Sequence, residues 1–395
     1  MIKYIIKTLV DLLSIDTRTK KNNETEAAIY IKKKLDEYNI WSEIIEPITG
    51  KGSVIGYIPG RNKEKRNLLL LSHLDTCYYG NLEDWFMDPR RGTEYEGRVF
   101  GRGAIDCKGL VALCMGILVY LKTNNIILER GIVFAGTADE ESGGHFGSKY
   151  LLSNHHLIKE SGYVLSEGGG FPIKVDEGLY YLCQYGERGK LRYCLLEDDG
   201  RKLLMDKKRI VGRLDKELIE GSKNLSDSYR LFDSLYQKST VNHSRRIDYE
   251  DIFSNSVSIY MQEEKSILEI DYLPEIKKVS IIDAVRNMYD IELSDNNLIK
   301  DVPAYLSNTD TGLYKIIENE TSKYLPEAKV IPYITPGYSD NRLFREQGKV
   351  TYGYFPMDIN NSLSGIHGYN EYISYKSLEI GFQILKNIIM KFCLD

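Results

Sequence analysis

Apolar runs alternate with segments of helical period over the first ~180 residues of the chain. Three of the apolar runs predict buried strands, at residues 67–75, 131–141 and 162–170. Apolar residues at helical spacing predict helices at residues 2–13, 107–122 and 146–154. This alternation predicts an α/β domain with a mostly parallel sheet, in which ligands lie beyond the carboxyl ends of the strands.

The pattern changes near Gly186 and returns after about residue 303. Between these points, the sequence predicts local α+β structure: an alternating strand from 189, a charged helical segment at 215–239, and two antiparallel strands at 254–275. Beyond them it predicts a helix at 311–325, strands at 328–335 and 349–356, and a closing helix within 372–392. We therefore predict a domain formed by 1–186 and 303–395, with a second domain, 187–302, inserted into it.

The bulk composition agrees with two globular domains, because 395 residues exceed one ordinary core. Hydrophobic residues make up 42% and charged residues 28%, a balance typical of globular rather than disordered chains. The net charge is −5 with both signs interleaved, so neither a nucleic-acid partner nor a membrane surface is predicted.

The location is predicted from the first helix and the cysteines. The first helix is amphipathic and interrupted by Asp11, unlike a signal peptide, and no apolar run reaches the ~18 residues of a membrane span. Six cysteines without C-x-x-C spacing are too sparse for a disulfide scaffold or a thiolate zinc motif. We therefore expect a reducing cytoplasm.

Ionisable side chains gather at the predicted strand ends and in loops. They are His73, Asp75, Asp106, Glu140, Glu141, Glu167 and His367. Two histidines with several carboxylates form a nitrogen and oxygen ligand set, which suits zinc, cobalt or manganese. A shared carboxylate would allow two metals ~3.5–4 Å apart, the spacing of two-metal hydrolases.

Each part of this set also has an ordinary interpretation. His73 with Asp75 could be a turn pair, Glu140 with Glu141 a solvated loop, and Glu167 a turn residue beside three glycines. Three further histidines on or near a polar helix are interpreted as surface residues: His145, His155 and His156. The functional interpretation therefore depends on the whole set and its order along the chain.

In that order, the motifs resemble those of one known family. They are SHLDT, Trp85 with the following Asp-Pro, GRVFGRGAIDCKG, GTADEESGGHFGSKYL, SEGGG, TPGYSDNRLFREQGKVTYGYFP and HGYNEY. The chain is similar to the zinc-dependent amidohydrolases that include aminoacylase, carboxypeptidases G and S, acetylornithine deacetylase and succinyl-diaminopimelate desuccinylase. The resemblance implies a phosphorylase/hydrolase-like zinc exopeptidase domain with an inserted lid of the dimerisation type, and hence a homodimer through that lid.

The resemblance also implies two zinc ions per chain, for which cobalt or manganese could substitute. The implied ligands are His73 and Glu167 for one metal, Glu141 and His367 for the other, and Asp106 for both. Asp75 would hold the second ring nitrogen of His73. Glu140 would be the general base that takes a proton from the water bridging the metals. A cis peptide bond between Asp106 and Cys107 is implied as well.

The inserted domain departs from the family pattern. The expected G-x-x-x-H-x-S-x-P-like stretch, whose histidine stabilises the oxyanion, is absent, and His243 is the only histidine there. It is either a relocated substitute or a surface residue. The family also has an arginine in a D-x-R-x-x-P pattern, and here the text is EIDYLPE, with Asp271 and Tyr272 and no arginine. Asn255 matches a family asparagine, and Arg342 is retained, so these two and His243 are the candidate substrate-binding residues.

Two functions of different classes fit this sequence. The first is a hydrolase of a small peptide or N-acyl amino acid, that is an exopeptidase, dipeptidase or deacylase. The second is a metal-binding regulatory or binding protein with little turnover. The altered lid favours the second, whereas the intact Glu140 and the complete ligand set favour the first.

Overall fold

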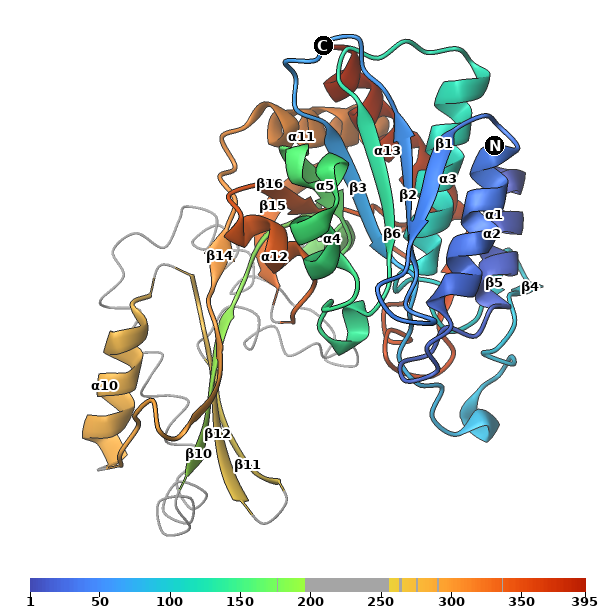
Figure 1. Cartoon of the computed structure of the whole chain (residues 1–395). Helices are drawn as coiled ribbons and strands as arrows, with labels where there is room; N and C mark the ends of the chain where they lie inside the picture. Colours follow the sequence, from blue (N-terminus) through green and yellow to red (C-terminus); the bar gives the residue numbers. More distant parts are fainter. Residues whose placement is uncertain (176, 196–255, 263–264, 275, 290, 336) are drawn as a thin grey trace. The chain divides into compact units, whose positions relative to one another are not determined.

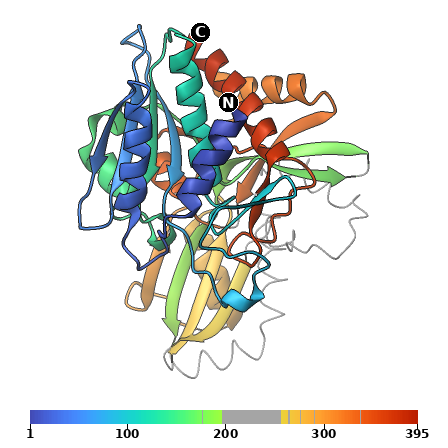
Figure 2. The ribbon, with the colours of Figure 1, turned by 90° about the vertical axis from the view of Figure 1, so that its right-hand side faces the viewer.

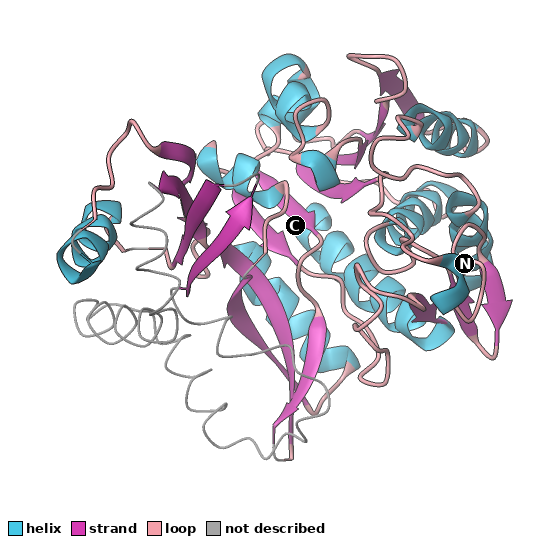
Figure 3. Cartoon of the chain, turned by 90° about the horizontal axis from the view of Figure 1, so that it is seen from below, coloured by secondary structure: helices cyan, strands magenta, loops and turns pink. Residues whose placement is uncertain are grey.

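The computed structural model describes residues 1–175, 177–195, 256–262, 265–274, 276–289, 291–335 and 337–395 (Figure 1). By their contacts, the described residues divide into two units. Unit 1 comprises Met1–Gln184, Ser307–Pro332 and Ser339–Asp395, and unit 2 comprises Tyr185–Leu306 and Tyr333–Tyr338. Each unit has its own sheet, and Figure 3 shows helices in cyan and strands in magenta.

Unit 1 is built on a sheet in the order β1-β2-β6-β3-β7-β16-β9. These strands are β1 (Trp41–Ile45), β2 (Ser53–Ile58), β6 (Ile132–Thr137), β3 (Leu68–His73), β7 (Tyr163–Ser166), β16 (Val350–Gly353) and β9 (Gly178–Glu187). The central strands β6, β3, β7 and β16 are parallel, and the outer pairs are antiparallel. The predicted α/β class with a mostly parallel central sheet is confirmed.

Further strands pair with β9 or form a small sheet of their own. β8 (Phe171–Val175) and β15 (Ala328–Thr335) pair with β9, and β14 (Tyr305–Leu306) pairs with its last residues, which belong to unit 2. A separate three-stranded sheet contains β4 (Thr93–Tyr95), β5 (Arg98–Phe100) and β17 (Tyr372–Ser374).

Helices cover both faces of the central sheet. One face packs on α4 (Ser148–Asn154), α5 (His156–Glu160) and α12 (Asn341–Glu346), which share a buried apolar cluster with β2, β3, β6 and β7. The others are α1 (Ile2–Leu13), α2 (Glu24–Asp36), α3 (Lys108–Thr123), α11 (Gly312–Tyr324) and α13 (Tyr375–Leu394). α1, α3 and α13 contact one another, and α3 contacts β3 (Figure 2). All six residues of β3 are buried, as expected of a central parallel strand.

Unit 2 is an antiparallel sheet in the order β11-β12-β10-β13, with one described helix. Its elements are β10 (Gly189–Leu195), β11 (Ser256–Gln262), β12 (Lys265–Tyr272), α10 (Lys278–Tyr289) and β13 (Leu298–Val302). Apolar residues of β10 and β12 form its core with Ile281 and Val285 of α10. The predicted antiparallel pair at 254–275 is present as β11 and β12, whereas the predicted helical segment 215–239 lies outside the described residues.

Two details of the sequence analysis need correction. Residues 185–186, 303–306 and 333–338 belong to unit 2 and not to the domain assigned as 1–186 and 303–395. Within unit 2, the Tyr338 hydroxyl donates to Asp271 Oδ1 at 2.8 Å. His155 is not a surface residue: only 6% of it is exposed, and its Nε2 lies 2.7 Å from Glu43 Oε1 of β1.

None of the described helices has both the length and the hydropathy needed to cross a lipid bilayer.

Candidate metal centre

The candidate ligands converge at one edge of the central sheet. His73 ends β3, Glu141 lies just after β6, and Glu167 directly follows β7. Because these strands are neighbouring and parallel, their carboxyl ends bring the three side chains to the same edge. Asp106 comes from the loop before α3, and His367 from the loop before β17.

Asp106 lies between the two histidines. Its Oδ1 is 3.0 Å from His73 Nε2, and its Oδ2 is 3.0 Å from His367 Nε2. Glu141 Oε2 lies 3.5 Å from His367 Nε2, and Glu167 Oε1 lies 4.0 Å from His73 Nε2. The five residues that the resemblance named as ligands are therefore adjacent, with one carboxylate between two imidazole–carboxylate pairs.

The Asp75 carboxylate was expected to hold the second ring nitrogen of His73, but in the structure it has other partners. The Nδ1 of His73 lies 2.9 Å from the backbone oxygen of Asp75 but 3.6 Å from its carboxylate. The carboxylate instead accepts hydrogen bonds from the backbone N–H groups of Glu140 and Glu141, at 3.1 and 3.0 Å. These two N–H groups open the short 3-10 helix η2 (Glu140–Ser142) and have no helical partner of their own. Asp75 thus fixes the loop that carries Glu140 and Glu141.

The electrostatics of the group show an excess of negative charge. Burial, with neighbouring carboxylates adding to it, raises the pKa of Glu140 and Glu167 well above the usual carboxyl range. Hydrogen bonds to Asp106 and Glu141 raise the pKa of His367 to about 10. Against the effect of burial, the two histidines hold the pKa of Asp106 far below its usual value. A bound cation would relieve this excess.

The donors also fit a metal. Glu141 Oε1 is buried and has no hydrogen-bond partner among the described residues, as expected of an atom reserved for an ion. Three overlapping groups have ligand atoms within 4.8 Å of one another: His73 with Asp106 and Glu141, His73 with Cys107 and Glu167, and Cys77 with Glu141 and His367. Nitrogen and carboxylate oxygen predominate, which suits zinc, cobalt or manganese.

Glu371 positions the Asp106 loop, a role the sequence analysis did not assign. Its carboxylate accepts hydrogen bonds from the backbone N–H groups of Gly103, Ile105 and Asp106 at 2.9, 2.8 and 3.1 Å. It also pairs with the Arg102 guanidinium at 2.8 Å, and both side chains are almost completely buried. The peptide bond between Asp106 and Cys107 is cis, as the resemblance implied.

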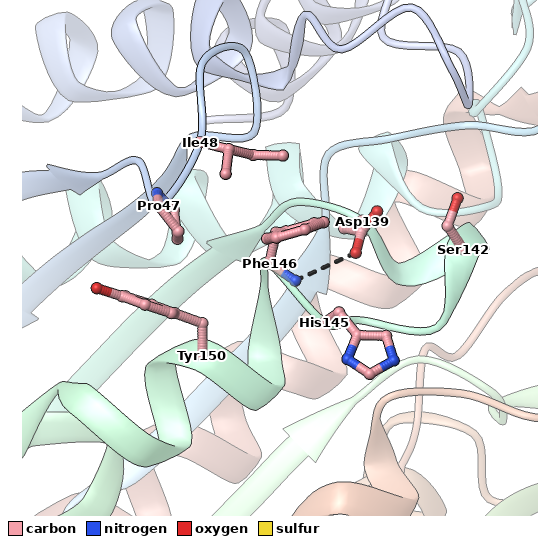
Figure 4. A pocket seen from close by; sticks show the side chains of 7 residues that line it. All are labelled: Pro47, Ile48, Asp139, Ser142, His145, Phe146 and Tyr150. Atoms are coloured by element: carbon pink, nitrogen blue, oxygen red, sulfur yellow. Dashed lines mark hydrogen bonds between the residues drawn. The ribbon is translucent and has the colours of Figure 1, made fainter.

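A second buried ion-pair network supports the loop that carries Glu140. Lys51 Nζ lies 2.7 Å from Glu24 Oε1 and 3.1 Å from Asp139 Oδ1, and all three side chains are at most 6% exposed. Asp139 directly precedes Glu140, and its Oδ2 accepts a hydrogen bond from the Phe146 N–H at 3.1 Å (Figure 4). The network therefore ties α2 and the turn before β2 to the loop of the candidate base.

We expect Lys51→Met to destabilise the protein by ~3–5 kcal/mol, because removing one partner of a buried ion pair leaves the other charges unpaired. Chemical denaturation of the variant and the parent checks this. Lys149→Met removes an exposed lysine and is the matched control. Equal stability of the two variants would contradict the role of Lys51.

Beside η2 the surface has a pocket of about 510 Å³. Figure 4 shows its lining residues: Pro47, Ile48, Asp139, Ser142, His145, Phe146 and Tyr150. None of the candidate metal ligands lines it, so the pocket is distinct from the candidate centre.

Of the three candidate substrate-binding residues, only Arg342 is among the described residues. His243 and Asn255 lie outside the described residues. The guanidinium of Arg342 donates to the backbone oxygens of Ser339 and Gly143, at 2.8 and 3.4 Å. Arg342 therefore links α12 to the end of η2, and its contact with a substrate stays a prediction.

The chain matches known proteins in sequence and in fold. The sequence model of peptidase family M20/M25/M40 matches residues 69–391. A probable succinyl-diaminopimelate desuccinylase of Staphylococcus aureus strain Mu50 is 30% identical over 179 residues, 45% of this chain and 42% of the relative. The match thus spans less than half the length of that relative.

Solved structures resemble the chain over nearly its whole length. Human carnosine dipeptidase 1 aligns with a TM-score of 0.70 at 15% identity, covering 99% of this chain and 97% of that one. A Bacillus subtilis protein described as a dinuclear metal binding peptidase from the M20 family aligns with a TM-score of 0.59 at 13% identity, covering 99% and 98%. At such identities the likeness shows the fold alone.

Proposed function

The chain belongs to peptidase family M20/M25/M40, and we propose that it is a metal-dependent hydrolase that cleaves an amide bond in a small peptide or N-acyl amino acid. One observation carries the proposal: Asp106 lies 3.0 Å from both His73 and His367, beside the loop of Glu140. The desuccinylase and dipeptidase names of similar proteins support an amide substrate.

The proposed centre holds two zinc ions per chain, with cobalt or manganese as substitutes. The proposed ligands are His73 and Glu167 for one ion, Glu141 and His367 for the other, and Asp106 for both. When bound, such ions polarise the amide carbonyl and lower the pKa of water so that it can attack at neutral pH.

Glu140 is the proposed general base, a role that needs a carboxylate held beside the ligands but not used as one. Its backbone N–H is fixed by Asp75, while the neighbouring Glu141 lies against His367. From this position Glu140 accepts the proton of the attacking water and passes it to the departing amine. Asp75 acts as a positioning residue for both glutamates.

The alternative, a metal-binding protein with little turnover, is favoured by one observation in unit 2. The EIDYLPE segment, at the place of the D-x-R-x-x-P pattern, holds Asp271 and Tyr272 and no arginine, and Tyr272 is only 5% exposed in the apolar core of unit 2. This segment therefore supplies no guanidinium to bind a substrate carboxylate. A preference for substrates with a free carboxylate should weaken unless Arg342 makes that contact.

The experiment that separates the two functions is release of free amine from a panel of dipeptides, N-acetyl and N-succinyl amino acids. We expect turnover of at least one member by the metal-loaded protein, lost with a chelator. Glu140→Gln, purified in parallel, controls for contaminating peptidases. Binding of panel members without any amine release would favour the alternative and overturn the proposed hydrolase.

We further propose that the segment 187–302 acts as a lid and mediates a homodimer, which sedimentation analysis would test.

The cytoplasm is the proposed location. All six cysteines are unpaired, as a reducing compartment requires.

A further inference from the structure

Cys77 lies at the candidate metal centre although it belongs to no expected ligand set. It follows Asp75 by two residues in the loop after β3. Its Sγ lies within 4.8 Å of a carboxylate oxygen of Glu141 and a ring nitrogen of His367. The thiol is half-buried, forms no disulfide, and donates a long hydrogen bond of 3.8 Å to the backbone oxygen of Tyr78.

A second observation at the same place also points to a ligand. The Glu141 side chain is only 9% exposed, and its Oε1 has no hydrogen-bond partner in the described part of the chain. Its Oε2 lies 3.5 Å from His367 Nε2. A thiol, a carboxylate and an imidazole thus converge from three separate segments, and one oxygen of that carboxylate has no hydrogen-bond partner in the described part of the chain.

We infer that Cys77 is an additional ligand of the ion held by Glu141 and His367. This inference rests on the proposed function, since it assumes the metal centre described above. Binding would release the thiol proton to water, because a metal takes sulfur as the thiolate. One half of the centre would then have a soft sulfur donor, which favours zinc or cobalt over manganese at that half.

Cys107 is the competing thiol and must be separated from Cys77. It lies within 4.8 Å of ligand atoms of His73 and Glu167, on the other half of the centre. Cys107 is completely buried, whereas Cys77 is half-buried and 58% of the His367 side chain is exposed. Both histidines lie 3.0 Å from Asp106, but Glu141 on the Cys77 half keeps an oxygen without a hydrogen-bond partner in the described part of the chain. These differences favour Cys77.

The test is cobalt substitution followed by absorption spectroscopy and elemental analysis of the full chain. Thiolate bound to cobalt gives a near-ultraviolet charge-transfer band that nitrogen and oxygen ligands do not give. We expect this band in the parent and in Cys107→Ser, and its loss in Cys77→Ser with cobalt still bound. Cys77→Ala and Cys107→Ala repeat the comparison if a serine variant fails to fold.

Each outcome decides a different claim. A band that persists in Cys77→Ser, or disappears only in the Cys107 variants, overturns the assignment of Cys77. Bound cobalt with visible bands but no near-ultraviolet band overturns the thiolate ligand and leaves the proposed hydrolase intact. A parent chain that binds no cobalt at all overturns both the inference and the metal centre of the proposed function.

Discussion

Glu140→Gln is expected to lower turnover by at least ~10²-fold while the metal content stays unchanged, the usual scale for loss of a general base. Glutamine keeps the shape of the side chain but cannot accept the proton of the attacking water. The backbone N–H of Glu140, which Asp75 holds at 3.1 Å, is unaffected by this change, so the loop should keep its position. Steady-state kinetics and elemental analysis of the same preparations check both parts.

The matched control is Glu160→Gln, which removes the same charge from an exposed position of α5. It should have the parent's turnover. If Glu140→Gln retained turnover within a few-fold of Glu160→Gln, Glu140 would not be the base. If it lost the metal, Glu140 would be a ligand instead.

Asp106→Asn is expected to act on the metal first. Both oxygens of Asp106 lie 3.0 Å from a histidine nitrogen, so one substitution weakens both proposed ion sites. The fall in metal affinity should exceed the ~10–100-fold typical of losing only an outer-shell partner. Turnover should fall with it. Metal titration by calorimetry, with the parent alongside, measures the loss.

The comparison with Glu140→Gln is the decisive part of this prediction. The proposed function gives the two carboxylates different roles, since Asp106 lies between the histidines and Glu140 on the adjacent loop. Asp106→Asn should therefore lose metal and turnover together, whereas Glu140→Gln loses turnover alone. Identical behaviour of the two variants would contradict this division of roles.

The sequence predicted the central strands, and with them the strand-end positions of His73, Glu141 and Glu167, because these depend on local pattern. Residues 68–73 form a completely buried run that ends in His73, and the structure shows β3 there with its histidine at the ligand edge. Asp106 and His367 follow no such strand. Their adjacency to His73 was predicted only through the order and spacing of family motifs.

The supporting contacts could not be predicted, because they join distant residues that carry no periodic signal. Glu371 binds the N–H of Gly103 across 268 positions of the chain, and a glutamate in a polar motif looks the same whether buried or solvated. Lys51 likewise gives no sign in the sequence that it pairs with Glu24 and Asp139 in the interior. The 3.6 Å between the Asp75 carboxylate and His73 Nδ1 depends on which N–H donors compete for that carboxylate.

The central proposal is that the chain is a hydrolase with a two-metal centre. Elemental analysis tests it most directly, on the purified chain before and after chelation and after incubation with zinc. Two zinc ions per chain are expected after incubation, and the chelator should remove them together with the amidohydrolase activity, which returns when zinc is restored. A chain that holds no transition metal after mild purification, and takes up none when zinc, cobalt or manganese is added, would contradict it.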